Sequence, residues 1–300
     1  MIRSSICGFI VAVASTAFAV ESNVALPRYP AVSPDGRSVT FSWRGDLWTV
    51  ATTGGAAKRL TSHPADELFS SYSRDGKRIA FTSTRNGYQN LYVMNADGTG
   101  ITHAFNSDRP NVLNGWTKGP AGDDVLVFSS RLSQANMPDS RVYVVPPSGG
   151  EPQLLFGAFG YSADVSPDGT KVLFNRGTSS WSRRHYRGSD SREIWMYDRN
   201  ANTYTRLPTW PGNDGRARWV DNDTFVFTSD RQDNCVNLYR LSLGQKEETA
   251  ERLTRFTDTD VEDIGVSADG KTLVFAMWDR LYRLDLARVQ EGPIAIDITA

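Results

Sequence analysis

Apolar and polar residues alternate along most of the chain, in runs of four to six positions separated by short polar turns. This period of two is typical of strands that bury one face. The clearest example is a Ser-Pro-Asp-Gly turn at residues 33–36, followed by an alternating run that ends near Phe41. Pro presets φ in such a turn, Asp hydrogen-bonds its own backbone, and Gly accepts a positive φ. The pattern predicts β-strands joined by tight turns.

The same pattern occurs six times, in four clear copies and two weaker ones. Six residues after the turn position comes a Phe, and the next strand carries an aromatic residue at its second position. The equivalent turn positions are Asp35, Asp75, Gly122, Asp168, Asp221 and Asp269. They are separated by 40, 47, 46, 53 and 48 residues, a period typical of propeller blades. We therefore expect an all-β fold, a six-bladed β-propeller of four-stranded antiparallel blades.

The repeats fill the chain, so we expect one domain over residues 20–300. The predicted blades cover about residues 29–61, 67–105, 111–156, 161–207, 216–254 and 261–299. We name the strands of a blade a to d, with strand a nearest the axis, and expect the repeated aromatic residues to pack between neighbouring blades. Residues 294–298 supply a strand d for the last blade, so the ring needs no strand from the N-terminus.

Residues 1–19 have the features of a signal peptide. Arg3 gives a positive start, residues 6–14 form an apolar core, and Ala17-Phe18-Ala19 is a small-x-small cleavage site. The apolar run is too short to span a bilayer. We expect an exported protein, periplasmic or secreted, with no membrane span after the signal is removed.

The composition restricts the class of partner. The chain is 39% hydrophobic and 22% charged, with a formal net charge of −1. Nothing in this balance indicates nucleic acid or an anionic membrane surface. After loss of the signal, Cys235 is the one remaining cysteine of the two, so no internal disulfide is expected.

The most distinctive loop joins strands b and c of the fourth blade, at residues 176–192. In a propeller the d–a and b–c connections share one face, here called the long-loop face, where binding residues gather on a rigid scaffold. Guanidinium forks bind carboxylates and aromatic rings offer stacking faces. We therefore predict a carboxylate-binding site made of Trp181, Arg183, Arg184, His185, Tyr186, Arg187 and Arg131. The alternative is a solvated loop whose arginines pair with Asp190 and Glu193.

Other constellations are weaker. The acidic stretch at residues 258–263 offers oxygen ligands for Ca²⁺ but lacks the Gly and the distal Glu of an EF-hand loop. His63 and His103 are isolated, and no Gly-x-Ser-x-Gly elbow or Gly-rich phosphate loop occurs. The sequence therefore assigns no catalytic residue, no metal site and no cofactor.

The repeat resembles the WD40-like repeats of the TolB and tricorn protease propellers. Three stretches point to tricorn: Phe-Ser-Trp-Arg-Gly-Asp-Leu-Trp at 41–48, His-Tyr-Arg-Gly at 185–188 with the strand at 193–197, and Thr-Ser-Asp-Arg at 228–231 with 237–239. The resemblance covers about residues 26–300. It implies the first, six-bladed propeller of a large serine peptidase that trims peptides. The family's second propeller, PDZ domain and catalytic domains have no counterpart in these 300 residues.

Three hypotheses follow. The first is a non-catalytic, exported propeller that binds or gates peptides or proteins through its long-loop face, as the accessory domain of a tricorn-like peptidase. The second is a TolB-like periplasmic scaffold for protein partners. The third is a propeller enzyme with an active site in its channel.

Overall fold

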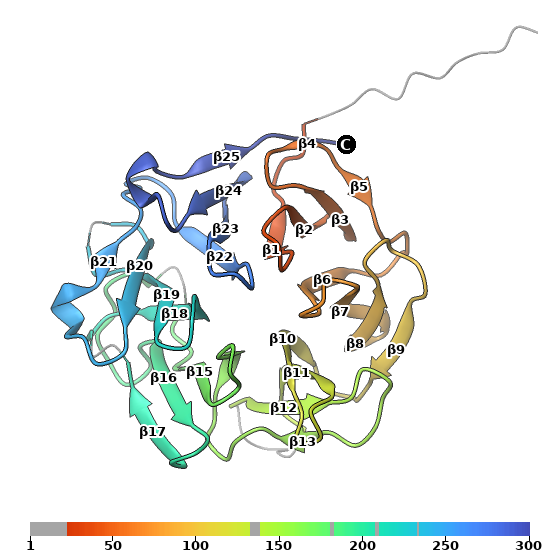
Figure 1. Cartoon of the computed structure of the whole chain (residues 1–300), viewed down its shortest axis with the longest axis horizontal. Helices are drawn as coiled ribbons and strands as arrows, with labels where there is room; N and C mark the ends of the chain where they lie inside the picture. Colours follow the sequence, from red (N-terminus) through yellow and green to blue (C-terminus); the bar gives the residue numbers. More distant parts are fainter. Residues whose placement is uncertain (1–22, 133–138, 181–182, 208–209, 233) are drawn as a thin grey trace, which may run out of the picture.

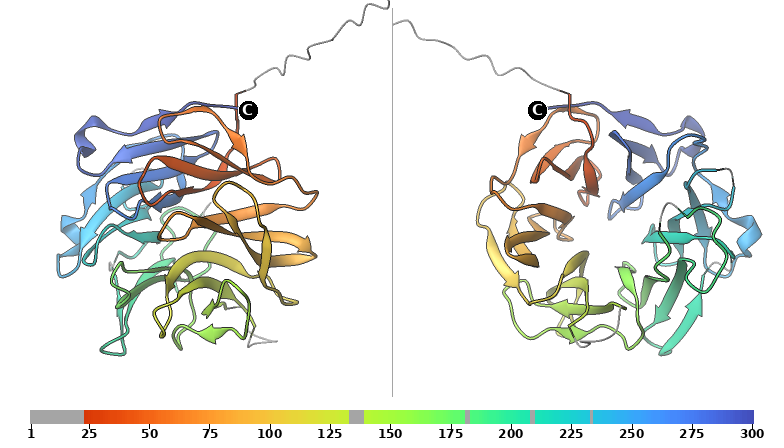
Figure 2. Two further views of the ribbon diagram at one scale, coloured as in Figure 1. Left: turned by 45° about the vertical axis from the view of Figure 1, so that its right-hand side comes forward. Right: turned by 180° about the vertical axis from the view of Figure 1, so that it is seen from behind.

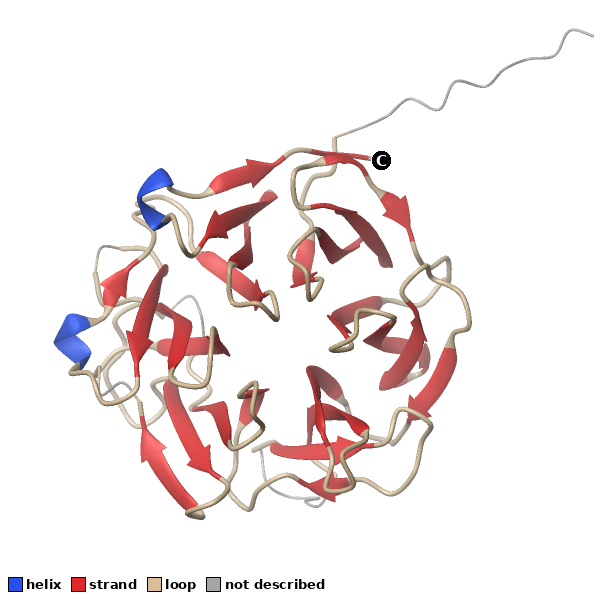
Figure 3. Cartoon of the chain, in the orientation of Figure 1, coloured by secondary structure: helices blue, strands red, loops and turns tan. Residues whose placement is uncertain are grey.

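The computed structural model describes residues 23–300 apart from 133–138, 181–182, 208–209 and 233. The expected signal peptide lies outside the described residues. Six four-stranded antiparallel sheets stand around a common axis (Figure 1), which confirms the predicted six-bladed propeller. Besides strands, the described part of the chain has two single-turn 3₁₀ helices, η1 (Glu247–Thr249) and η2 (Val289–Glu291), as Figure 3 shows.

The strands of each blade follow one another along the chain. Blades 1 to 3 consist of β1 (Arg28–Val32), β2 (Ser38–Trp43), β3 (Asp46–Ala51) and β5 (Lys58–Arg59); β6 (Glu67–Tyr72), β7 (Arg78–Asn86), β8 (Tyr88–Asn95) and β9 (Thr102–Phe105); and β10 (Val112–Lys118), β11 (Asp124–Ser130), β12 (Arg141–Val145) and β13 (Gln153–Leu154). Blades 4 to 6 consist of β14 (Tyr161–Val165), β15 (Lys171–Arg176), β16 (Glu193–Asp198) and β17 (Thr203–Arg206); β18 (Asp214–Trp219), β19 (Thr224–Ser229), β20 (Asn237–Ser242) and β21 (Glu251–Arg252); and β22 (Val261–Val266), β23 (Thr272–Met277), β24 (Arg280–Asp285) and β25 (Ile294–Ile296). The first strand of every blade is the innermost, and Figure 2 shows the same radial order from two further directions.

The repeated turn is held by its own side chains. In blade 1, Ser33 Oγ donates to Asp35 Oδ1 at 2.6 Å, and the same carboxylate oxygen accepts from the Arg37 N–H at 3.1 Å. These hydrogen bonds hold the pKa of Asp35 below its ordinary value. Gly36 has φ of 72°, which only glycine adopts readily. The turn aspartates are therefore structural, as the sequence indicated.

The repeated Phe of strand b forms the core between blades. The six residues, each at most 1% exposed, are Phe41, Phe81, Phe128, Phe174, Phe227 and Phe275. In blade 3, Phe128 lies opposite Tyr143 with ring centroids 5.5 Å apart, and both belong to one buried cluster with Leu91 of blade 2. Such aromatic pairs add about 0.5–1.5 kcal/mol beyond the area they bury. The predicted packing between neighbouring blades is confirmed.

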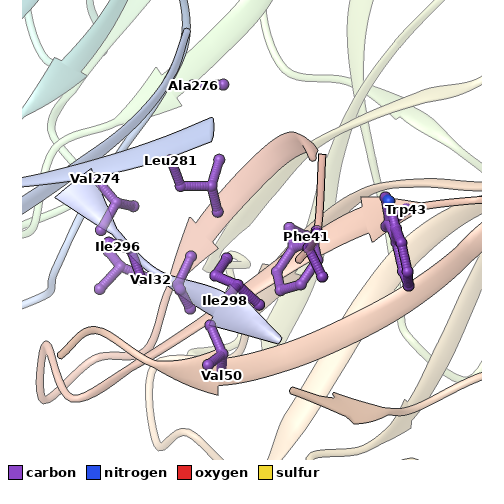
Figure 4. Close-up of a cluster of buried hydrophobic side chains, with 11 residues drawn as sticks. Val32, Phe41, Trp43, Val50, Val274, Ala276, Leu281, Ile296 and Ile298 are labelled. Atoms are coloured by element: carbon purple, nitrogen blue, oxygen red, sulfur yellow. The ribbon is translucent and has the colours of Figure 1, made fainter. Parts of the chain in front are cut away.

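The two ends of the ring meet through a parallel strand pair. Past β25, the short strand β26 (Ile298–Thr299) pairs with β4 (Gly55–Ala56) of blade 1. Figure 4 shows the buried cluster behind this seam, which includes Val274 of the last blade, Ile298 of β26 and Phe41 of the first blade. Blade 6 thus has its own strand d, and the chain beyond it closes the ring.

Candidate functional site

Each innermost strand carries a β-bulge, and the bulges shape the channel. The register shifts once within β1, β6, β10, β14, β18 and β22. Four bulged residues are left-handed: Tyr29, Phe69, Ser162 and Arg216, with φ of 52°, 50°, 52° and 50°. Such a conformation costs a non-glycine residue about 1–3 kcal/mol and is concentrated at functional sites. Because a bulge also re-aims a side chain, these positions are candidates for contact with whatever enters the channel.

A pocket of about 350 Å³ lies at the long-loop end of the channel. Its wall comes from the first residues of β1, β18 and β22 and from the b–c loops of blades 5 and 6. It includes the bulged residues Tyr29 and Arg216, together with Arg28, Arg192 and Trp278. The pocket therefore joins residues from blades 1, 4, 5 and 6.

Three arginines from three blades converge on the acidic start of β22. Arg28 of blade 1 pairs with Glu262, and Arg216 of blade 5 pairs with Asp263. Arg184 from the blade 4 loop binds Asp260 through two guanidinium nitrogens. The acidic stretch considered as a calcium site is therefore engaged by arginines, and the described residues contain no group of three His, Cys, Asp or Glu that could hold a metal ion.

The long loop of blade 4 crosses towards blades 5 and 6. The backbone N–H of His185 donates to Asp230 Oδ2 at 2.7 Å, and Arg184 reaches Asp260 at 2.8 Å. Both carboxylates belong to the pocket wall. The predicted alternative partners are engaged elsewhere, since Asp190 accepts from Thr178 and Glu193 pairs with Arg206. The loop is thus fastened beside the pocket.

The other predicted binding residues differ in their surroundings. Arg183 lies over the ring of Tyr186 at 3.8 Å, and Arg187 lies 5.6 Å from the ring of Trp210. Both arginines are exposed and accessible to a ligand. Arg131, also exposed, follows β11 in blade 3, the blade next to blade 4 in the ring. Trp181 lies outside the described residues.

The pocket wall holds three arginines and five carboxylates, and Arg192 is the arginine of this wall that has no ion pair within the described residues. Arg192 donates through Nε to the Ser179 carbonyl at 2.8 Å, and its terminal nitrogens have no partner among the described residues. Burial, with Arg192 and Arg218 nearby, lowers the pKa of Arg216 to about 10. Arg216 is still a cation at neutral pH, so the two guanidinium groups of this wall repel each other.

The short-loop end of the channel has a different character. A second cavity of about 340 Å³ lies there, with Asp164 and Arg218 in its wall. Arg74 from the turn of blade 2 reaches the turn of blade 4, donating to the Pro167 carbonyl at 2.8 Å. Burial raises the pKa of Asp164 above its ordinary value. At this end the side chain of Arg74 therefore links the turns of blades 2 and 4 directly.

Comparison with known proteins places the chain in a family. The family model described as the tricorn protease N-terminal beta propeller domain matches residues 24–290. The chain belongs to this family. A curated relative, tricorn protease homolog 1 of Streptomyces coelicolor (strain ATCC BAA-471 / A3(2) / M145), is 28% identical over 269 residues, which are 86% of this chain and 23% of the relative. The tricorn resemblance inferred from sequence is confirmed.

Solved structures agree on the fold. The crystal structure of the tricorn protease superposes with a TM-score of 0.73 at 19% identity, covering 91% of this chain and 26% of that one. TolB from Acinetobacter baumannii superposes with a TM-score of 0.59 at 16% identity, covering 93% of this chain and 66% of that one. The chain therefore spans about a quarter of the tricorn proteins that it matches.

Sequence reasoning did not identify the pocket as a site. Arg192 was noted only as part of the arginine-rich loop, while Arg216, Arg28 and Trp278 belong to ordinary strands and turns. One signal was available: Arg216 and Arg218 are two residues apart, so both face the same side of an innermost strand unless a bulge intervenes. The bulge between them turns the two side chains apart, so that Arg216 lines the pocket at the long-loop end and Arg218 lines the cavity at the short-loop end.

Proposed function

We propose that this tricorn-type propeller is a non-catalytic, exported module that binds or gates peptides or proteins at its long-loop face. It acts as the accessory propeller of a tricorn-like serine peptidase, whose catalytic domains lie outside this chain. The observation that carries the proposal is the arginine-rich loop of blade 4, fastened by Asp230 and Asp260 beside a pocket at the channel mouth. Membership of the tricorn propeller family supports the link to proteolysis.

The chemistry of the loop suits a peptide carboxylate. Arg183 and Arg187 are exposed, each lies near an aromatic ring, and neither forms an ion pair with a described residue. A guanidinium held over a ring keeps its donor edges free for a carboxylate. Arg184 is engaged by Asp260, so it supports the loop more than it offers a free fork.

Export is part of the proposal and rests on the signal-like residues 1–19. The part of the chain that the structure describes contains no helix long and apolar enough to cross a membrane. Expression of the full chain in a bacterial host, with the mass of the periplasmic product measured, tests this. Loss of the first 19 residues supports export, while an intact chain in the cytoplasm contradicts it.

Calorimetric titration tests the binding function. Short peptides are compared as free acids and as C-terminal amides, with the wild-type protein and with Arg183→Ala/Arg187→Ala. Since a hydrogen bond to a charged group contributes about 1.5–3 kcal/mol, we expect the double variant to bind the free acids at least tenfold more weakly. Arg184 is left in place because its removal deprives the largely buried Asp260 of its partner.

The matched control is Arg37→Ala. The side chain of Arg37 is 86% exposed and lies in a short-loop turn, on the opposite face of the ring. We expect this variant to bind like the wild type. Equal affinity of the double variant and the wild type for every peptide acid would exclude the loop arginines as the carboxylate site.

A further inference from the structure

The pocket at the channel mouth has unused hydrogen-bond donors on one wall. Arg192 is half-buried and uses only Nε, for the Ser179 carbonyl. Arg216 uses one terminal nitrogen, for Asp263. The remaining guanidinium nitrogens of these two residues have no partner in the described part of the chain. Two neighbouring forks with free donors suit an oxyanion.

The carboxylates of the wall already have partners of their own. Asp214 binds Arg231 through both carboxylate oxygens, and Asp260 binds Arg184. Asp230 accepts from Trp210 Nε1, from the backbone N–H groups of His185 and Asn213, and from Asn213 Nδ2. The acidic groups that stay open are one oxygen each on Glu262 and Asp263, which already face arginines. The carboxylates of the wall are therefore already bonded, and the donors that remain open belong to Arg192 and Arg216, where an oxyanion can accept from them.

Part of the wall is aromatic. Tyr29, at the left-handed bulge of β1, lies against Phe69 in a tilted arrangement with ring centroids 4.1 Å apart. Trp278 is 60% exposed, the most exposed large hydrophobic residue of the described chain, with Arg28 5.8 Å from its ring. An exposed indole at the rim of a pocket is a typical contact for a planar apolar group.

We propose that this pocket binds a carboxylate that is attached to a planar apolar group. The carboxylate lies between Arg192 and Arg216, and the apolar group lies against Tyr29 and Trp278. The volume of about 350 Å³ is at the small end of known small-molecule sites, which range from about 300 to 1,000 Å³. The ligand is a small aromatic acid or the aromatic C-terminal residue of a peptide. The site does not depend on the proposed peptide-handling function.

Calorimetry with 3-phenylpropionate tests the site, and its neutral analogue 3-phenylpropanamide shows whether the charge is recognised. A second arm uses N-acetyl-Ala-Phe as free acid and as amide, which distinguishes a free small acid from a peptide end. Inorganic phosphate, an oxyanion without an apolar group, is the third probe. We expect the acids to bind at least tenfold more tightly than the amides and than phosphate.

Variants locate the binding. Arg192→Met keeps most of the side-chain volume and leaves no carboxylate unpaired, so we expect a folded protein with at least tenfold lower affinity for the acids. Arg192→Lys keeps the charge without the fork and should recover part of the affinity. Trp278→Ala should lower the affinity for the aromatic acids and leave the affinity for acetate, which has no aromatic group, unchanged. Arg37→Ala again serves as the matched control, and thermal midpoints verify folding.

The outcomes separate this inference from the proposed function. Binding of 3-phenylpropionate without the peptide acid supports the pocket and counts against peptide handling. Binding of both acids, lost in Arg192→Met, supports both. Equal binding of acids and amides, or an unchanged affinity in Arg192→Met, overturns the pocket assignment, and peptide binding that depends on Arg183 and Arg187 then leaves the proposed function standing.

Discussion

Replacing Arg231 with Met should destabilise the ring more than the loss of a surface charge would. Arg231 is 8% exposed and Asp214 is 2% exposed, and they are joined by contacts of 3.0 and 3.2 Å. The guanidinium also lies 5.1 Å from the ring of Phe227 and 5.0 Å from that of Tyr239. Removing one partner of a buried ion pair costs about 3–5 kcal/mol, because the other charge stays desolvated without compensation. We expect urea unfolding to show a loss of about 3 kcal/mol or more.

Two further variants test the cause. Asp214→Asn/Arg231→Met removes both charges and should recover much of the lost stability, because no buried ion is then left unpaired. The matched control is Arg280→Met, since Arg280 and Asp279 form an ion pair whose side chains are 48% and 52% exposed. Such a pair contributes about 0–1 kcal/mol. A double variant no more stable than Arg231→Met would refute the argument from the buried charge.

Two other predictions concern the channel and the seam. Burial raises the pKa of Asp164 above 3.8, so its ionisation costs the folded state stability as pH rises. Asp164→Asn should therefore raise the thermal midpoint at pH 7. This gain should disappear in acid, where the Asp164 carboxyl is protonated in both the folded and the unfolded state. At the seam, a Cβ on Gly54 would lie 2.6 Å from the Asp297 carbonyl oxygen, whereas one on Gly87 meets nothing within 4 Å. Both glycines have a left-handed φ, 89° and 93°, so the backbone strain of an alanine is similar at the two positions. Because of the additional clash, Gly54→Ala should lower the thermal midpoint more than Gly87→Ala. Equal losses would mean that closure of the ring by β26 and β4 does not limit stability.

The number of blades could be predicted because the blade signal is local. A Ser-x-Asp-Gly turn needs only its own side chains, as the 2.6 Å hydrogen bond from Ser33 to Asp35 shows. The four copies with this turn, at Asp35, Asp75, Asp168 and Asp269, are therefore visible in a short window. The Phe six residues later is buried because strand b lies in the interior of its blade, with neighbouring residues on both faces buried as well. The closing pair of β26 and β4 could not be predicted in this way, because two-residue strands carry no periodicity.

The contacts of the site were harder to predict because they join blades. The sequence suggested Asp190 and Glu193 as partners for the loop arginines, since both are near in the chain. Arg184 instead meets Asp260, 76 residues away. The bulges that place Tyr29 and Arg216 are equally hidden, because a single extra residue in one strand leaves the alternating pattern almost unchanged.

The blades themselves distinguish structural arginines from those available to a ligand. In blades 2 and 5 the same ion pair recurs at the same strand positions, Glu67 with Arg85 and Asp214 with Arg231, so this pair belongs to the architecture of a blade. The left-handed residues at the position of Arg216 in other blades are not arginines. The left-handed bulge is equally formed when the residue that occupies it is Tyr29, Phe69 or Ser162. The backbone at this position therefore accepts an aromatic side chain or a small hydroxyl, and the propeller fold does not require a guanidinium there. We infer that Arg216 is explained better by the ligand that enters the channel.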